Sequence, residues 1–304
     1  MRYASAAAFR QALEARFVAL SRDGGVSLVR LRKSVAFDRL LARLFAVAPD
    51  RWVLKGGLAL DYRLGTKART TMDIDLTGPG GGEDAATADL LATGELDLGD
   101  HFSFAIERTA KLDQLVEGSA VRYHVQADLA GRLFEEFLVD MGFDFPAGWE
   151  PDRLQGPDLL AFADIEPVQA PSLPLELQIA EKVHAYTRGY GQSGMASTCV
   201  KDLVDLALIA SASQVNADRL NRALRETFRQ RDRHGLPGAL PRPPADWRVP
   251  YARMATEVGL AAELARGYAL AARFLDPVLS GELGAAFWEP AAHGWVARSS
   301  QGSD

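Results

Sequence analysis

Hydrophobic and polar residues alternate with two different periods along the first half of the chain. Apolar residues recur at helical spacing over residues 5–21 and 34–48, whereas short apolar or alternating runs occupy 52–54 and 72–76. Helices repeat every 3.6 residues and strands every two, so these patterns predict two N-terminal helices followed by strands. Later runs predict further elements: helices over 58–64 and 85–91, and strands over 102–106, 123–127 and 136–140.

The pattern changes after residue 145. Proline and glycine accumulate over 146–174, which is typical of a surface linker. Helical spacing then prevails and predicts helices over 174–187, 200–212, 216–233, 250–275 and 280–287. We therefore expect an α+β protein, with N-terminal helices and a mixed sheet in residues 1–165 and a C-terminal helical bundle in residues 166–304.

Composition and charge narrow the class of protein. The 304 residues are 48% hydrophobic and 24% charged, which is typical of a globular protein of about two domains. The net charge of -6 argues against non-specific coating of nucleic acid, so any RNA contact needs a local basic patch. The single cysteine allows no internal disulfide, and neither a long apolar run nor an apolar signal segment occurs. We expect a soluble cytoplasmic protein with no membrane partner.

Two aspartates in an apolar setting are the first candidates for chemistry. Asp73 and Asp75 lie two apart on the strand predicted over 72–76, so both side chains should point to one side with Cα atoms roughly 6–7 Å apart. Two carboxylates at that spacing can share a divalent cation, and Mg²⁺ in particular binds carboxylates together with nucleotide phosphates. Thr71 falls on the same face. A solvent-facing pair at a strand end is the alternative.

A glycine pair strengthens the nucleotide interpretation. Gly56 and Gly57 stand between a predicted strand and a predicted helix, where glycine lets the backbone approach a ligand closely and the helix N-terminus can hold a phosphate. A tight strand-to-helix turn with no ligand is the alternative. Two metal ions would require a third carboxylate. Asp140, at the end of an apolar strand, is our candidate, and Asp128 is the rival; either could instead be a turn or cap residue.

At this point the sequence resembles a known family. The segments Lys55-Gly56-Gly57-Leu58-Ala59-Leu60 and Arg69-Thr70-Thr71-Met72-Asp73-Ile74-Asp75-Leu76 are similar to the AbiEii/AbiGii nucleotidyltransferase toxins, which include the MenT-type toxins. Two further segments, 178–186 around Lys182 and 200–206 around Asp202, are similar to the helical motifs of that family. The four segments occur in the family's order and span roughly residues 34–210.

The resemblance implies a DNA polymerase β-like nucleotidyltransferase fold and the transfer of a nucleoside monophosphate from an NTP. In MenT-type relatives the acceptor is the 3′ end of tRNA, transfer blocks translation, and the toxin is encoded beside an antitoxin. The implied cofactor is Mg²⁺ or Mn²⁺. Carried over residue by residue, the expected catalytic groups are Asp73, Asp75, Lys182 and Asp202, and the metal ligands are Asp73, Asp75 and Asp140. The resemblance makes Gly56, Gly57 and Lys182 the expected nucleotide-binding residues. To these we add Arg69, as a candidate for phosphate contact, and Thr71, which shares the face of the carboxylates.

The helical motifs also suggest physical roles. A lysine such as Lys182 beside a triphosphate can neutralise charge that develops in the transition state. Asp202 would hold Lys182 in place or activate the acceptor hydroxyl as a base, with Asp205 on the same helix face behind it. Arg69 and Arg188 are further candidates for phosphate contacts. Part of the active site is thereby expected in the helical half.

Two regulatory or binding features remain. A phosphate on Thr71 would add negative charge beside the carboxylates, so Thr71 is a candidate regulatory phosphosite. On the helix predicted over 216–233, one face carries a basic stripe that could track RNA, although a solvated helix face is the simpler interpretation. This stripe consists of Arg219, Arg222, Arg225 and Arg229. Rival functions are transfer to a protein hydroxyl or a small molecule, and a non-catalytic nucleotide-binding module.

Overall fold

A seven-stranded mixed sheet with helices forms the first of two units in the structure. The computed structural model describes residues 1–78, 82–111, 121–188, 199–231 and 233–297. The first unit comprises Met1–Thr66 and Thr70–Leu173, and the second comprises Lys67–Arg69 and Pro174–Asp304. None of the described helices is both long and apolar enough to cross a membrane.

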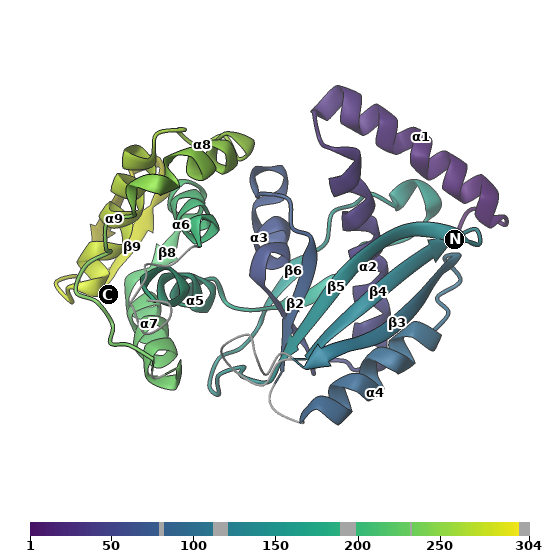
Figure 1. The fold of residues 1–304 in the computed structure, drawn as a ribbon, viewed down its shortest axis with the longest axis horizontal. Coiled ribbons are helices and arrows are strands. Elements are labelled where there is room, and N and C mark those ends of the chain that lie inside the picture. Colours follow the sequence, from purple (N-terminus) through teal and green to yellow (C-terminus); the bar gives the residue numbers. More distant parts are fainter. Residues whose placement is uncertain (79–81, 112–120, 189–198, 232, 298–304) are drawn as a thin grey trace, which may run out of the picture. The chain divides into compact units, whose positions relative to one another are not determined.

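The helices of the first unit are α1 Ala6–Gly24, α2 Leu28–Val47, α3 Gly56–Leu64 and α4 Gly82–Glu95, with short 3-10 turns η1 Gly65–Lys67, which runs on into the second unit, and η3 Ala161–Ala163. The strands are β1 Val53–Lys55, β2 Asp73–Thr77, β3 Phe102–Lys111, β4 Val121–Leu129, β5 Arg132–Gly142, β6 Asp152–Gln155 and β7 Gln169–Ser172. The strands are arranged in the order β3-β4-β5-β2-β1-β7-β6 (Figure 1). Strand β2 is parallel to β5 and antiparallel to β1. All the predicted elements of this half are present, with ends shifted by a few residues.

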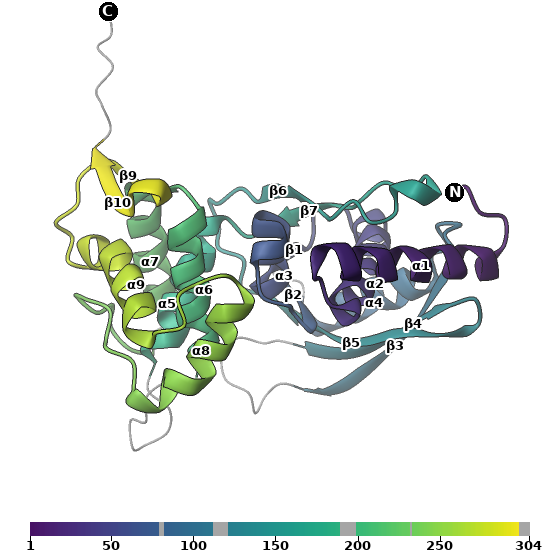
Figure 2. The ribbon, with the colours of Figure 1, turned by 90° about the horizontal axis from the view of Figure 1, so that it is seen from above.

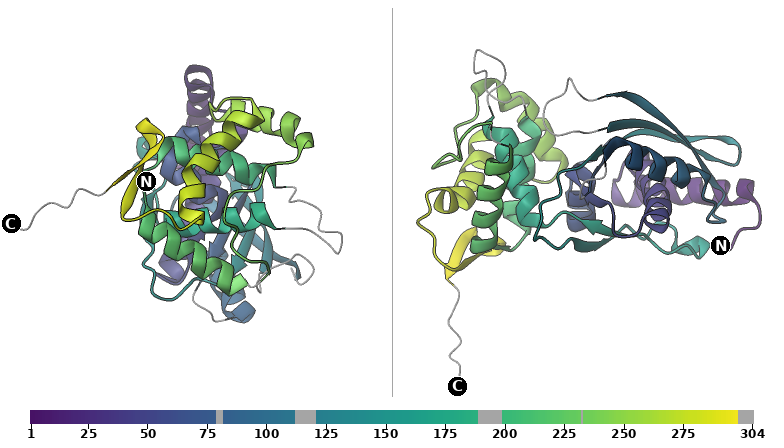
Figure 3. Two further views of the ribbon diagram at one scale, coloured as in Figure 1. Left: turned by 90° about the vertical axis from the view of Figure 1, so that its left-hand side faces the viewer. Right: turned by 90° about the horizontal axis from the view of Figure 1, so that it is seen from below.

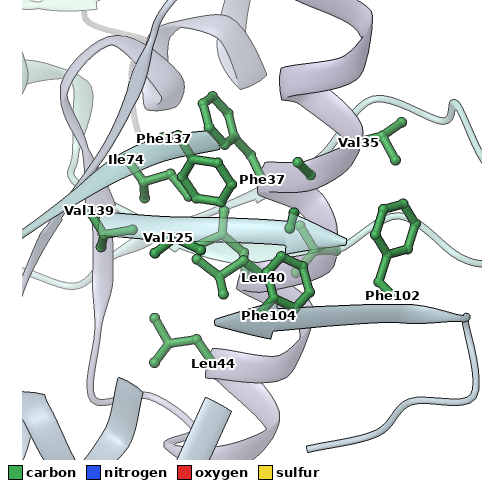
Figure 4. Packing of buried hydrophobic residues seen from close by; sticks show 14 of the residues in the cluster. Val35, Phe37, Leu40, Leu44, Ile74, Phe102, Phe104, Val125, Phe137 and Val139 are labelled. Carbon is green, nitrogen blue, oxygen red and sulfur yellow. The ribbon is translucent and has the colours of Figure 1, made fainter. Parts of the chain in front are cut away.

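Apolar side chains on one face of the sheet form the core with α2. Ile74, Val125 and Val139 of the strands are fully buried, and Ile74 and Val125 alternate with polar neighbours on the opposite face. Figure 4 shows these residues packed against Phe37 and Leu40 of α2. Figure 2 shows α2 and α4 as a layer along β3, β4 and β5. Because this layer covers one face, polar residues of β2, β4 and β5 are left to line the other.

The linker prediction for 146–174 is wrong in part, since this stretch contains β6 and β7. Strand β7 pairs with β6 over four residues and with β1 through Leu54 and Ser172. Pro171 has no N–H group to donate to a neighbouring strand. Strand β7 lies near the sheet edge formed by β6 and pairs with β1 over a single registered pair, so the proline costs the sheet little hydrogen bonding. The first unit therefore extends to Leu173, just before helix α5 begins.

The second unit is mostly helical (green to yellow in Figure 3). Its elements are α5 Leu175–Thr187, α6 Val200–Ala212, β8 Val215–Asn216, α7 Ala217–Arg231, η4 Ala245–Trp247, α8 Arg248–Glu257, α9 Leu264–Leu279, β9 Ala286–Glu289, η5 Pro290–Ala292 and β10 Gly294–Ala297. Helices α5 and α6 coincide with their predictions to within one residue. Residue 232, inside the helix predicted over 216–233, lies outside the described residues.

Two predictions for this unit are wrong. The helix expected over 250–275 is two helices, because Gly259 adopts a φ of +72° and ends α8. The helix expected over 280–287 is absent, and β9 instead pairs with β8 and β10 in a three-stranded sheet. Ala286 and Trp288 of β9 are buried while their neighbours are not, so the strand has a two-residue period. The run of four residues is too short for this period to be recognised in the sequence.

Candidate functional site

Asp73 and Asp75 lie on the face of the first unit's sheet that is opposite the apolar core. They are half-buried and alternate with Ile74 and Leu76, which are buried. The alternation of β2 therefore directs both carboxylates to one side, as the two-residue spacing predicts. Thr71, just before the strand, is 6% exposed and donates its hydroxyl to Asp73 Oδ1 at 3.0 Å.

The turn between β1 and α3 lies directly against Asp75. Gly56, the first residue of α3, has a backbone φ of +65°, which residues other than glycine rarely adopt. A Cβ atom at this position would lie 1.9 Å from Asp75 Oδ2. Gly56 therefore lies in close contact with the Asp75 carboxylate, and the approach of a ligand to this turn stays a prediction.

Strand register builds a row of four charged residues across the sheet. Arg122 of β4 pairs with Asp140 of β5, Asp140 with Asp75 of β2, and Asp75 with Lys55 of β1. Residues that pair directly across neighbouring strands point to the same face. The row therefore reads cation, carboxylate, carboxylate, cation on the face that carries Asp73.

Arg122 forms a bidentate contact with Asp140 in this row. Its Nε and Nη2 atoms donate to Asp140 Oδ1 and Oδ2, both at 2.7 Å, a bidentate geometry that favours guanidinium–carboxylate pairs. These hydrogen bonds raise the pKa of Arg122 above its ordinary value, and the charges of Asp73 and Asp75 contribute further. A permanent cation consequently faces all three candidate metal ligands.

Asp144 occupies the neighbouring position beside Lys55. Its Oδ1 atom accepts a hydrogen bond from Thr77 Oγ1 at 2.9 Å and lies 3.6 Å from Lys55 Nζ. Thr77 follows Asp75 by two residues and shares its face of β2. The rival carboxylate Asp128 pairs instead with Leu133, at the far end of β5 from Asp140. Register thus brings Asp140, and not Asp128, beside Asp75.

In the second unit, Lys182 lies in a buried cluster of charges. Its Nζ atom is 2.6 Å from Asp205 Oδ2 and 3.7 Å from Asp202 Oδ1. Arg69 also donates to Asp205, from Nε at 3.1 Å and Nη2 at 3.3 Å. Lys182, Asp202 and Asp205 are each less than 9% exposed. Asp205, expected only behind Asp202, is therefore the residue that binds both cations.

Burial and pairing shift the pKa values of this cluster in opposite directions. Burial alone would lower the pKa of Lys182, but Asp205 and Asp202 outweigh it and raise the pKa. Burial raises the pKa of Asp202, and Lys182 offsets this only in part. For Asp205, burial is outweighed by Lys182 and Arg69, so its pKa is lowered. Lys182 is therefore protonated at neutral pH and is suited to neutralise charge.

Helix α7 carries the four arginines of the predicted basic stripe, and all four are exposed. Arg219 pairs with Glu176 at 3.1 Å and Arg222 with Glu226 at 2.9 Å, whereas Arg225 bonds the neutral side chain of Asn221. His184 is fully buried among aromatic rings including Phe228. Arg188, a second candidate for phosphate contact, lies at the C-cap of α5.

The first unit's carboxylates fit a divalent cation that also binds phosphate. Asp73 and Asp75 present oxygen ligands on one face, which is the pair of groups that Mg²⁺ commonly takes from a protein when phosphates supply the rest. Within the described ranges, no three His, Cys, Asp or Glu side chains gather closely enough to enclose a metal ion on their own. Asp140 is next to Asp75, with both oxygens bonded to Arg122.

Sequence reasoning missed Arg122 and Asp144 and gave no role to Lys55. Lys55 and Arg122 join the candidate site through cross-strand pairing, and Asp144 joins it through its contacts with Thr77 and Lys55. The hydrogen-bond partners Arg122 and Asp140 are 18 residues apart in the sequence. Alternation within β4 places Arg122 opposite the core residues Val121 and Tyr123, so a correct guess of the strand order would have revealed it. No short motif marks Arg122 or Asp144, and Lys55 was noted only as the first residue of the glycine segment.

Comparison with known proteins identifies the family. The profile described as nucleotidyl transferase AbiEii toxin, type IV toxin–antitoxin system, matches residues 39–276. The fold is similar to that of MenT4, a nucleotidyltransferase toxin from Mycobacterium tuberculosis, at a TM-score of 0.52 and 20% identity over 88% of this chain and 99% of that one. A protein of H. pylori assigned as a nucleotidyltransferase matches at a TM-score of 0.47 and 14% identity, over 83% of this chain and 97% of that one. No curated protein sequence matches the chain.

These findings confirm the family and fold class expected from the four sequence segments. The family profile spans most of the chain and includes the carboxylate strand, the Lys182 helix and the Asp202 helix. The likeness to MenT4 extends the agreement to the fold. This chain belongs to the AbiEii family of nucleotidyltransferase toxins of type IV toxin–antitoxin systems.

Proposed function

We propose that this toxin transfers a nucleoside monophosphate from an NTP to the 3′ end of tRNA and so blocks translation, in a reaction that depends on Mg²⁺ or Mn²⁺. The observation that carries the proposal is the placement of Asp73 and Asp75 on one face of β2 with the Gly56 turn against them. Carboxylate oxygens and a glycine turn at a helix N-terminus together suit a metal-bound triphosphate. The family implies a cognate antitoxin as a partner.

In the proposed reaction, the terminal hydroxyl oxygen of the acceptor attacks the α-phosphorus of the NTP. A new oxygen–phosphorus bond forms, the bond to the bridging oxygen breaks, and pyrophosphate leaves. Asp73 and Asp75 would hold the metal ion, which supplies positive charge against the phosphate oxygens. The backbone at Gly56 and Gly57 would admit the triphosphate, and Thr71 would orient Asp73 through its 3.0 Å hydrogen bond.

The charged cluster around Lys182 would serve the same reaction. The raised pKa of Lys182 keeps its ammonium group protonated, so it would stabilise phosphate charge rather than remove a proton. Arg69, bound to the same Asp205, would add a second positive charge. Asp202 would accept the proton of the acceptor hydroxyl, since its raised pKa makes it a stronger base than an ordinary aspartate.

The choice of tRNA as the acceptor rests on the exposed arginines of α7. A polynucleotide presents a row of phosphates, and arginines along one helix face can contact successive phosphates. Arg219, Arg222, Arg225 and Arg229 form such a row on a protein whose net charge is -6. A small-molecule acceptor would not need this extended basic surface.

A labelling experiment tests the proposal. Incubate the protein with Mg²⁺, total tRNA and each α-³²P-labelled NTP in turn, and separate RNA from protein by electrophoresis. We expect label in the tRNA band, abolished by EDTA and by Asp73→Ala. The matched control is Asp128→Ala, which removes a β4 carboxylate outside the Asp75 row and should retain activity.

Other outcomes would redirect the proposal. Label in protein with none in tRNA would identify a protein hydroxyl as the acceptor, and label in added low-molecular-weight alcohols would identify a small molecule. If wild type and Asp73→Ala behave alike under every condition, the chain is a nucleotide-binding module without transfer activity.

We propose in addition that phosphorylation of Thr71 switches the enzyme off. Its hydroxyl bonds the Asp73 carboxylate, so a phosphate there would repel Asp73 and occupy the place of the nucleotide phosphates. Thr71→Glu should lower transfer at least as far as Asp73→Ala does, while Thr71→Ser should stay active. A fully active Thr71→Glu enzyme would disprove the switch.

A further inference from the structure

The row Arg122–Asp140–Asp75–Lys55 bears on how many metal ions the site takes. Three carboxylates at such a site would suit two divalent cations. Asp140 has the correct register for the third carboxylate, because it pairs directly with Asp75. Its two oxygens, however, accept both donors of Arg122 at 2.7 Å. The question is therefore which cation neutralises Asp140.

The sheet holds Arg122 in this position. Arg122 and Asp140 are registered partners within a β4–β5 ladder that runs from Val121 and Met141 to Leu129 and Arg132. A backbone shift that moved Arg122 away from Asp140 would break the hydrogen bonds of this ladder. The two groups could therefore separate only if a side chain rotated. The Arg122 and Asp140 side chains are 32% and 19% exposed, so water screens the pair only in part.

A guanidinium and a divalent cation exclude one another on the same carboxylate. A metal ion bound to Asp140 would meet the permanent positive charge of Arg122 across the carboxylate, and like charges at that separation repel strongly away from bulk water. Asp75 follows Asp140 in the same cross-strand row, so Arg122 stands at the end of adjacent carboxylates. One arginine thus provides positive charge for the whole carboxylate group.

We propose that Arg122 takes the place of a second metal ion in this enzyme, so that the chain binds one divalent cation, through Asp73 and Asp75. This inference rests on the metal-dependent function proposed above. Arg122 acts as a positioning residue, since it neutralises Asp140 and prevents it from recruiting a further cation. Lys55 closes the other end of the row, where it lies 3.6 Å from Asp144 Oδ1.

Counting bound Mn²⁺ tests the proposal without any measurement of transfer. Titrate the full-length protein with Mn²⁺ and follow free Mn²⁺ by electron paramagnetic resonance, which gives the number of ions bound per chain. Wild type should bind one. Arg122→Gln, which frees both oxygens of Asp140, should bind two, and the double variant Arg122→Gln/Asp140→Asn should return to one.

Two controls separate the effect of this arginine from a general loss of charge or fold. Arg108→Gln removes an arginine of the adjacent strand β3 that pairs with Glu83, and should leave the count at one. Arg122→Lys keeps the positive charge and should also bind one ion. Thermal melts of each variant check folding. If Arg122→Gln does not fold, the number of ions bound by the wild-type protein still tests the proposal. Two ions bound per wild-type chain would overturn it.

The remaining outcomes distinguish this inference from the proposed function. A count of one in a folded Arg122→Gln variant would show that Arg122 does not exclude a second ion. A wild-type count of one that persists in Asp73→Asn would place the ion elsewhere and overturn both proposals. A wild-type count of two that falls in Asp73→Asn would support the metal role of Asp73 while overturning the role of Arg122.

Discussion

Gly56 combines two constraints that usually occur separately. Its φ of +65° favours glycine by itself, and its missing Cβ leaves the space that Asp75 Oδ2 occupies. The backbone constraint alone costs other residues about 1–2 kcal/mol. The steric constraint has a chemical consequence, since any side chain at residue 56 would displace a carboxylate of the candidate site.

Gly56→Ala should therefore reduce transfer by about 100-fold or more, the loss typical of a catalytic group moved by about an ångström. Gly25→Ala is the matched control, because Gly25 has a similar φ of +68° with nothing within 4 Å of its Cβ position. Gly25→Ala should lose about 1–2 kcal/mol of unfolding free energy, and Gly56→Ala should lose at least as much because of the added clash with Asp75. Steady-state kinetics and urea denaturation measure the two effects. Equal activities in the two variants would contradict the role assigned to the contact with Asp75.

The two aspartates beside Lys182 have pKa values shifted in opposite directions, so ionisation of each has the opposite effect on the stability of the fold. The lowered pKa of Asp205 means that its ionised form stabilises the fold at any pH above its unfolded value of about 3.9, a contribution lost as pH falls through the folded pKa. The raised pKa of Asp202 means that its ionised form costs stability at neutral pH, and this cost disappears as pH falls through the folded pKa. A carboxylate maintained at such a cost is typical of a functional group.

Asparagine substitutions at these positions should consequently differ in sign. At pH 7, Asp205→Asn should lower the unfolding free energy by about 3 kcal/mol, because it leaves Lys182 and Arg69 buried beside a neutral group. Asp202→Asn should be neutral or stabilising, yet should lose transfer activity. Urea denaturation at pH 7 and at about pH 3 measures both, and the penalty at residue 205 should shrink at the lower pH, which lies below the unfolded pKa of about 3.9. Equal destabilisation by the two variants would show that the two sites are equivalent.

At the residue scale, sequence reasoning identified groups that share one element. Asp73 and Asp75 could be paired because a strand's period is two, and Lys182 and Asp202 because each stands in a helical motif of the family. Arg122 and Asp144 could not be placed, since their contacts depend on which strands become neighbours and in what register. The primary role of Asp205 was missed because the distance from Lys182 depends on how α5 packs against α6.

Elements were predicted well where the periodic pattern is unbroken, as in α5, α6 and α7, and poorly where a glycine divides it, as over 250–275, or where it is short, as over 280–287. Strands β8 and β9 have two and four residues, so no window contains a full period-two signal. Tertiary contacts define them instead. Trp288 of β9 is fully buried, packs against Phe274 of α9 and donates Nε1 to the carbonyl oxygen of Ala210 at 2.7 Å. The small sheet is therefore part of the second unit's core.

Trp288→Ala should destabilise the second unit by about 3–5 kcal/mol, since it removes the largest buried side chain of this sheet and leaves the Ala210 carbonyl without its donor. Val296→Ala on β10 is the control: Val296 is 54% exposed, so the change should stay within about 0.5 kcal/mol. Urea denaturation followed by circular dichroism measures both. A loss below about 1 kcal/mol in Trp288→Ala would mean that β9 contributes little to the fold.

For the whole molecule, the net charge of -6 and the arginines of α7 have opposite effects on an RNA acceptor. The overall negative charge repels a polyanion at long range, whereas exposed arginines attract it within about a Debye length, roughly 10 Å at 0.1 M salt. Arg219 and Arg222 are partly neutralised by Glu176 and Glu226. The attraction should therefore come mainly from the C-terminal half of the stripe, where Arg225 bonds a neutral asparagine.

This balance predicts how tRNA binding responds to charge reversal. Arg225→Glu/Arg229→Glu should weaken binding and reduce the slope of log K against log salt by about 2, since each lost phosphate contact changes the slope by about 1. Arg253→Glu/Arg266→Glu makes the same change of net charge at exposed residues of α8 and α9. If repulsion by the net charge governed tRNA binding, the two double variants would weaken binding equally and would show similar slopes of log K against log salt. Filter binding at several salt concentrations distinguishes the cases, and an unchanged slope in Arg225→Glu/Arg229→Glu would remove α7 from the RNA-binding surface.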